Sequence, residues 1–131
     1  MFQVQRSVAT VLVSAAAFLS GCATELPRSA APMEAAREAA DTPNEITFTA
    51  DVVARPPSDY SSTIRSGTVW KLAGRLVQGY VYRPVSTVFQ VESRHVHEAY
   101  LVISGRALVG VYLPVEQAFV SVERVNNLPV K

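Results

Sequence analysis

The sequence predicts an all-β fold, a small antiparallel barrel or sandwich of five to seven strands that follows a signal peptide and a disordered tether. Three observations lead to this prediction. Short runs in which apolar and polar residues alternate recur from residue 46 onward. These runs are rich in the β-branched and aromatic residues that strands favour. Gly, Pro and Ser cluster between the runs as turn signals, and no segment after residue 46 keeps a helical period over ten residues.

The first 21 residues read as an export signal. Arg6 is followed by an apolar run from Val8 to Phe18, which only Thr10 and Ser14 interrupt. A helix that crosses a bilayer needs about 20 apolar residues, and this run is about half that length. Its length instead suits the apolar core of a cleavable signal peptide, which we assign to residues 1–21.

The residues Leu19-Ser20-Gly21-Cys22 resemble the lipobox of bacterial lipoproteins, in which an aliphatic and two small residues precede a cysteine. The resemblance covers residues 1–22 only. It implies cleavage between Gly21 and Cys22, a diacylglycerol thioether on Cys22 and an acyl group, such as palmitate, on the new amine. Several acyl chains would anchor the protein to a membrane. Cys22 is the only cysteine, so no internal disulfide can form.

The residues after the cysteine bear on the choice of membrane. In lipoproteins an aspartate directly after the lipidated cysteine commonly retains the protein at the inner membrane, whereas Ala23 and Thr24 stand here. The resemblance therefore implies the outer membrane, with the mature protein facing the periplasm, and makes the inner membrane the less favoured location.

Residues 22–45 are predicted to form the lipidated cysteine and a flexible tether. The segment holds Pro27, Pro32 and Pro43, many alanines and no aromatic residue. Such a composition cannot bury enough apolar surface to fold by itself. As a coil it would reach about 25 Å, which would hold the following domain clear of the lipid headgroups.

Residues 46–131 are predicted to form one β-rich domain. Residues 54–67 are dense in Pro, Ser and Gly and are expected to be a loop, and Gly74 suggests a bulge or bend within its strand. The predicted strands cover residues 46–53, 68–77, 79–84, 86–93, 97–104, 107–114 and 118–125.

A hairpin around Gly105-Arg106 is the most informative part of this domain. Gly at the first central position suits a two-residue type II′ turn. The register that follows pairs Val102 with Val109 and Leu101 with Gly110. One face then carries Tyr100, Val102, Val109 and Val111, and the other carries Leu101, Ile103, Leu108 and Tyr112.

Both faces of this hairpin are therefore apolar, although a small domain has one core. Either Trp70, Phe89 or Phe119 covers the second face, or a closely bent barrel carries the hairpin between faces, or a partner covers it. The last alternative makes the eight hairpin residues a candidate interface for a protein partner or a second copy.

Little in the sequence points to catalysis or to a cofactor. His95 and His97 are the only histidines, and in an extended chain they share a face. They are weak metal-ligand candidates, because carboxylates such as that of Glu92 would have to complete the site. Asp51 and Asp59 are the only aspartates of the domain, and no nucleophile-elbow motif occurs. We therefore predict no enzyme and no bound cofactor.

The charge balance excludes one class of partner. Of the 12 Lys and Arg residues Arg6 lies in the signal, which leaves 11 against 11 acidic residues and gives no long-range attraction to nucleic acid. The predicted function is an interaction or structural component of an envelope assembly of the secretion, conjugation or pilus type. The alternative is a small ligand- or peptidoglycan-binding module, in which Trp70, Tyr80 and Tyr82 would line a binding face if they are not core. A metal-binding domain that uses His95 and His97 is less favoured.

Overall fold

Eleven strands make up the regular structure of residues 25–58 and 60–131, which are the residues that the computed structural model describes. The predicted all-β class is confirmed. The described residues contain no helix that could span a membrane. The predicted signal peptide and Cys22 lie outside the described part of the chain. The strands are β1 (Ser29–Ala30), β2 (Glu45–Thr47), β3 (Val52–Ala54), β4 (Ser62–Ile64), β5 (Val69–Arg75), β6 (Tyr80–Pro84), β7 (Gln90–Glu92), β8 (Val96–Glu98), β9 (Tyr100–Ser104), β10 (Ala107–Leu113) and β11 (Ala118–Val125).

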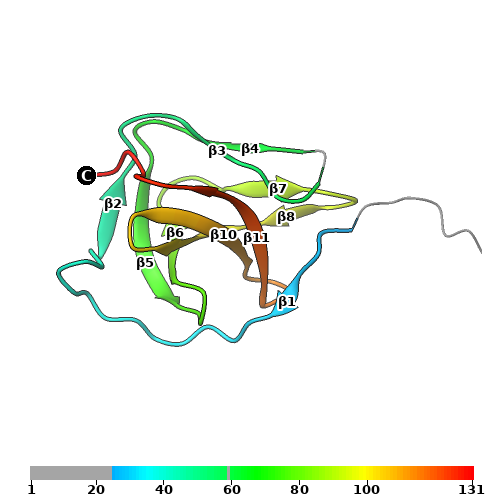
Figure 1. Cartoon of the computed structure of the whole chain (residues 1–131), viewed down its shortest axis with the longest axis horizontal. Helices are drawn as coiled ribbons and strands as arrows, with labels where there is room; N and C mark the ends of the chain where they lie inside the picture. Colours follow the sequence, from blue (N-terminus) through cyan, green and yellow to red (C-terminus); the bar gives the residue numbers. More distant parts are fainter. Residues whose placement is uncertain (1–24, 59) are drawn as a thin grey trace, which may run out of the picture.

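Seven of these strands form one antiparallel sheet in the order β1-β11-β10-β9-β6-β5-β2. The sheet is strongly curled (Figure 1) but does not close into a barrel, because β1 and β2 stay as its two edges. The C-terminal residues continue from β11 to the β2 edge, where the backbones of Thr47 and Lys131 exchange two hydrogen bonds of 3.0 Å. We call this junction between β2 and residues 128–131 the seam.

Two short hairpins, β3–β4 and β7–β8, cover one face of the curled sheet. The β4 strand lies within residues 54–67, which the sequence predicted to be a loop. Three-residue strands made of Ser, Thr and Ile alternate too briefly to stand out from turn residues. Side-chain hydrogen bonds attach the hairpins to each other, because Ser62 Oγ donates to the Gln90 carbonyl at 2.8 Å. The Glu123 amide donates to the Arg55 carbonyl and ties β11 to the end of β3.

The main core fills the space between the sheet and these hairpins. Trp70 lies at the centre of this core and is 1% exposed. Its ring meets those of Phe48 and Phe89 edge to face, with centroid distances of 6.1 Å to Phe48 and 5.5 Å to Phe89. The indole N–H donates to the Thr68 hydroxyl at 2.9 Å, so its only polar atom is satisfied. Trp70 and Phe89 therefore belong to the main core and do not cover the second face of the β9–β10 hairpin.

Residues 25–45, which we call the strap, run along the sheet (Figure 1). In β1, Ser29 and Ala30 pair with Phe119 and Ala118 of β11, and the Ala31 amide donates to the Gln117 carbonyl at 3.0 Å. Farther along, Glu34 and Arg75 exchange two backbone hydrogen bonds of 2.8 and 2.9 Å. Gly74 permits this approach, since a Cβ there would lie 2.6 Å from the Glu34 carbonyl oxygen.

The structure thus differs from the flexible tether that the sequence predicted for residues 22–45, at least from residue 25 onward. A composition of this kind indicates only that the segment cannot fold alone. The strap instead adds backbone hydrogen bonds to strands that already exist, and it places a few apolar side chains in gaps of the domain. Leu26 is 3% exposed and joins the main core, and Ala31 is 6% exposed.

A second, smaller core lies on the other face of the sheet, beneath the strap and the turn between β5 and β6. Its buried members are Ala31, Leu76, Val81, Val102 and Tyr112, and partly buried Ala73, Tyr100, Val109 and Phe119 pack against them. The chain therefore covers both apolar faces of the β9–β10 hairpin by itself. Among the residues predicted to cover the second face, Phe119 packs there.

The β9–β10 hairpin has the predicted turn but not the predicted register. Gly105 has φ 62° and Ser104 pairs with Ala107, as a two-residue turn requires. Beyond the Ile103–Leu108 pair a bulge at Val109 shifts the register by one residue. Gly110 therefore pairs with Val102, Val111 with Leu101, and Tyr112 with Tyr100.

The bulge corrects the predicted faces of the hairpin. Val111 joins Leu101, Ile103 and Leu108 in the main core, and Tyr112 joins Val102 in the smaller one. The two residues were predicted on the opposite faces, because a bulge moves every following side chain of its strand to the other side.

Candidate functional site

The predicted interface on the β9–β10 hairpin is occupied by the chain's own residues. Leu101, Val102, Leu108 and Val111 are fully buried, and Ile103 and Tyr112 are at most 6% exposed. Only Tyr100 and Val109 are half-buried. Gly110 lies against the ring of Phe119 of the same chain. The hairpin therefore offers no continuous apolar surface to a partner.

The structure pairs one of the two histidines with an acid that the sequence did not single out. His97 Nδ1 lies 2.6 Å from Glu116 Oε1, and the two side chains are 13% and 23% exposed. His97 comes from β8 and Glu116 from the turn between β10 and β11, so the contact joins two parts of the chain. The second carboxylate oxygen of Glu116 is buried and has no hydrogen-bond partner among the described residues.

The surroundings of Glu116 favour its charged form. Burial raises the pKa of this carboxyl, but the hydrogen bond with His97, a backbone hydrogen bond and the charges of His97 and Arg28 together lower the pKa below its usual value. Arg28 belongs to the strap and also lies 3.6 Å from Glu25. His97 and Glu116 therefore form a polar cluster that joins β8 to the turn before β11, and the charge of Arg28 in the strap acts on it.

This cluster does not have the composition of a metal centre. His95 is exposed in the turn between β7 and β8, and its ring centroid lies 6.5 Å from that of His97. Nowhere in residues 25–58 and 60–131 do three His, Cys, Asp or Glu side chains gather in a ligand-like group. The Nδ1 atom of His97 is engaged with Glu116. The arrangement ties β8 to the turn between β10 and β11.

A pocket of about 400 Å³, the seam pocket, opens beside the junction of β2 with the C-terminal residues. Ile46, Ile103 and Leu128 form its apolar floor, and each is at most 6% exposed. Tyr82 contributes its ring, and its hydroxyl donates to the Pro43 carbonyl of the strap at 2.8 Å. Desolvation by burial, together with Tyr80 and Asp41, raises the pKa of Tyr82 to about 12. The polar residues of the lining are Asp41, Arg106 and Lys131.

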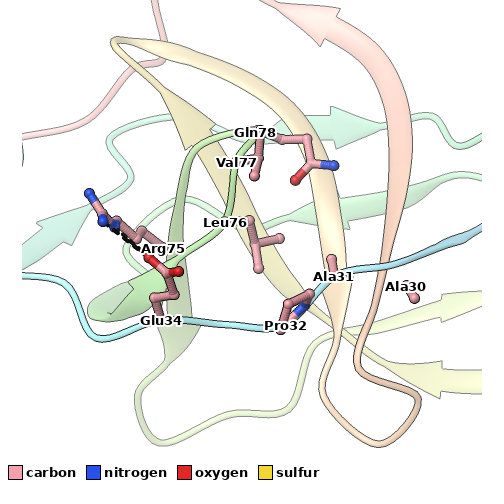
Figure 2. A pocket seen from close by; sticks show the side chains of 8 residues that line it. All are labelled: Ala30, Ala31, Pro32, Glu34, Arg75, Leu76, Val77 and Gln78. Atoms are coloured by element: carbon pink, nitrogen blue, oxygen red, sulfur yellow. Dashed lines mark hydrogen bonds and ion pairs between the residues drawn. The ribbon is translucent and has the colours of Figure 1, made fainter.

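A second hollow of about 390 Å³, the strap pocket, lies between the strap and the turn that joins β5 to β6. Figure 2 shows Glu34 and Arg75 paired along one side, and Arg75 donates to Glu34 Oε2 at 3.0 and 3.3 Å. The Gln78 amide lies on the opposite side, and its oxygen is buried without a hydrogen-bond partner among the described residues. The seam pocket is the better ligand site, because it combines an apolar floor with a few polar groups, as ligand sites usually do.

The sequence predicted some of the residues at these sites and not others. Tyr82 was considered for a ligand-binding face, and it does line a pocket, whereas Trp70 is core and lines none of the pockets described. Arg106 was considered only for its turn. Glu116 had no local signal, because it lies 19 residues from His97. Cys22, with the cleavage site at Gly21, lies outside the described residues, so lipidation stays a prediction.

Comparison with known proteins adds no family to this picture. No family model matches the chain, and neither the curated proteins nor the solved structures that were compared include a match.

Proposed function

We propose that this chain is a lipid-anchored protein of the bacterial cell envelope whose β domain serves as an interaction or structural component of an envelope assembly. The anchor is Cys22, and the favoured location is the periplasmic face of the outer membrane. The observation that carries the proposal is the position of the strap. Leu26 is buried in the main core only four residues after the cysteine that the lipobox resemblance marks for acylation.

A domain packed this close to its anchor is held at the membrane surface. Because both apolar faces of the β9–β10 hairpin are buried, this hairpin is not the partner site. Contacts to an envelope assembly would use the exposed strand ends and turns of the domain. The charge balance of the chain agrees with a protein partner more than with nucleic acid.

The anchor is tested by replacing Cys22 with serine. We expect the wild-type protein to fractionate with membranes and to carry the mass of diacylglycerol and an acyl chain. The Cys22→Ser variant should stay uncut or appear in the soluble fraction. Identical fractionation and identical mature mass of the two proteins would disprove lipid anchoring. Crosslinking in intact envelopes, compared with a soluble chain that begins at residue 23, then tests for a protein partner.

The seam pocket favours a second candidate function, the binding of a small amphiphilic anion. Its floor is apolar, and Arg106 and Lys131 contribute positive charge to a lining in which Asp41 is the acidic residue. Its volume of about 400 Å³ falls in the range of ligand sites. An apolar group would occupy the floor, and an acidic head group would lie toward the cations.

A suitable probe for the seam pocket is anilinonaphthalene sulfonate, which combines an aromatic body with an anionic group. We expect saturable binding at one site in the soluble chain, and at least fivefold weaker binding in Arg106→Glu. The matched control is Arg83→Glu, which changes an exposed arginine of β6 that does not line the pocket. Equal binding by all three proteins would disprove the site.

A further inference from the structure

The direction in which the strap leaves the fold determines which end of the domain is nearest to its anchor. Three residue steps separate Cys22 from Glu25. Because consecutive Cα atoms are about 3.8 Å apart, these steps span at most about 11 Å. Leu26 is buried and β1 is paired with β11, so the strap is fixed to the domain from Leu26 onward. The beginning of the strap is therefore within about 11 Å of the acylated residue, if Cys22 is acylated.

Two exposed valines lie at this end of the domain. Glu116 contacts His97 of β8, and the carbonyl of the adjacent Gln117 accepts a hydrogen bond from the Ala31 amide of the strap at 3.0 Å, so these three segments are neighbours. Val115 directly precedes Glu116 and is 79% exposed, and Val96 directly precedes His97 and is 57% exposed. In Figure 1 the strap enters beside the β7–β8 hairpin, whereas the C-terminus lies at the opposite end of the molecule.

The charges at this end are mixed. Glu25 pairs with Arg28 and Glu116 pairs with His97, while Glu92 and Glu98 of the β7–β8 hairpin are exposed. Arg94 is exposed in the turn between β7 and β8. Arginine side chains reach phosphate groups while their aliphatic stems lie on apolar material.

We propose that the end of the domain formed by the beginning of the strap, the turn before β11 and the β7–β8 hairpin lies on the membrane that holds Cys22, with Val115 and Val96 in the headgroup region. This inference rests on the lipid anchor of the proposed function. The contact itself is weak, because only two valine side chains supply its apolar surface. The anchor makes it effective, because the domain is tethered at a high local concentration next to the lipid.

This orientation has a consequence for the seam pocket. The pocket lies beside the C-terminal residues, at the end of the molecule away from the entry of the strap (Figure 1). A domain that rests on the membrane through Val115 and Val96 presents the seam pocket to the periplasm, where a soluble ligand or a partner can reach it.

The orientation is tested with the full lipidated protein in vesicles of phosphatidylethanolamine and phosphatidylglycerol. Val115→Cys, Val96→Cys and Lys131→Cys each add one free thiol, because acylation blocks Cys22, and each thiol carries the same fluorophore. Nitroxide groups on the lipid heads quench fluorophores near the surface. We expect at least threefold stronger quenching at residues 115 and 96 than at residue 131, which is exposed at the opposite end.

Vesicle flotation and the mass of the mature protein separate the two proposals. A protein that floats with its acyl chains but is quenched equally at residues 115 and 131 overturns the orientation and leaves the anchor intact. A protein that neither floats nor carries acyl chains overturns the anchor and the orientation together. In a Val96→Asp/Val115→Asp protein that still floats, we expect the quenching of a label at Ser93→Cys to fall toward that at residue 131. Unchanged quenching at residue 93 would contradict the role of the two valines.

Discussion

The replacement of Leu26 by alanine tests whether the strap is part of the fold. Leu26 is 3% exposed and packs in the main core, although it lies in a segment whose composition is that of a linker. The substitution removes three carbon atoms, and at about 0.8 kcal/mol for each the transfer term alone is about 2.4 kcal/mol. Any cavity that remains adds to this cost, and measured Leu→Ala changes in cores span about 2–5 kcal/mol.

The free energy with which the strap docks sets an upper limit to the stability lost in Leu26→Ala. The first residues of the strap can detach when their contacts weaken, so the cost cannot exceed the free energy with which the strap docks. We therefore expect a loss near the lower end of the range, about 2–3 kcal/mol. Urea denaturation of the soluble chain measures it, and with a slope of about 2 kcal/mol per molar the midpoint should fall by about 1 M or slightly more.

Val77→Ala is the control for this experiment. Val77 is a fully exposed apolar residue in the turn between β5 and β6, and its truncation should change stability by less than about 0.5 kcal/mol. If Leu26→Ala unfolds at the same urea concentration as Val77→Ala and the unmodified chain, Leu26 is not buried in solution and the strap is a free tether.

Three further predictions concern other contacts. Gly110→Ala should destabilise the fold by about 1–3 kcal/mol, because the new Cβ meets the Phe119 ring and the Val120 carbonyl; an unchanged melting temperature would contradict this packing. Glu116 has a lowered pKa, so it stabilises the fold above the ordinary value of 4.5, and this stabilisation is lost as the pH falls through the folded-state value; Glu116→Gln should flatten the acid side of a stability profile, and an identical profile would count against the His97 contact. Tyr82 has a pKa of about 12 against 10.0 when exposed, so its contribution to stability is complete below pH 10 and declines as the pH rises toward 12; absorbance titration should lose one late-ionising phenol in Tyr82→Phe.

The sequence predicted those features whose signals are local. The alternation of apolar residues and the glycine at position 105 were sufficient for the all-β class and for the turn between β9 and β10. The bulge at Val109 was not predicted, because the contact that accompanies it is not local. Beyond the bulge, Gly110 lies against the ring of Phe119 from the neighbouring strand.

The strap and the His97–Glu116 pair were missed for related reasons. Hydropathy describes side chains, whereas β1 and the Glu34–Arg75 bridge are held by backbone hydrogen bonds that almost any residue can make. Glu116 is an unremarkable turn residue until the fold brings β8 beside it. Tyr82 was a plausible binding residue by type, but its neighbours Ile46, Ile103 and Leu128 come from three separate segments of the chain.

The strap also constrains the order in which the chain can fold. Ser29 pairs with Phe119, and Phe48 bridges to Val130, so both contacts join the beginning of the domain to its last strand or final residues. Loops of this length close slowly, and contacts across them form late. A chain that is still emerging has neither β11 for the strap to pair with nor residues 128–131 to complete the seam. It therefore stays without its final contacts until the whole domain is present, and the export that the proposed lipid anchor implies would require such an unfolded chain.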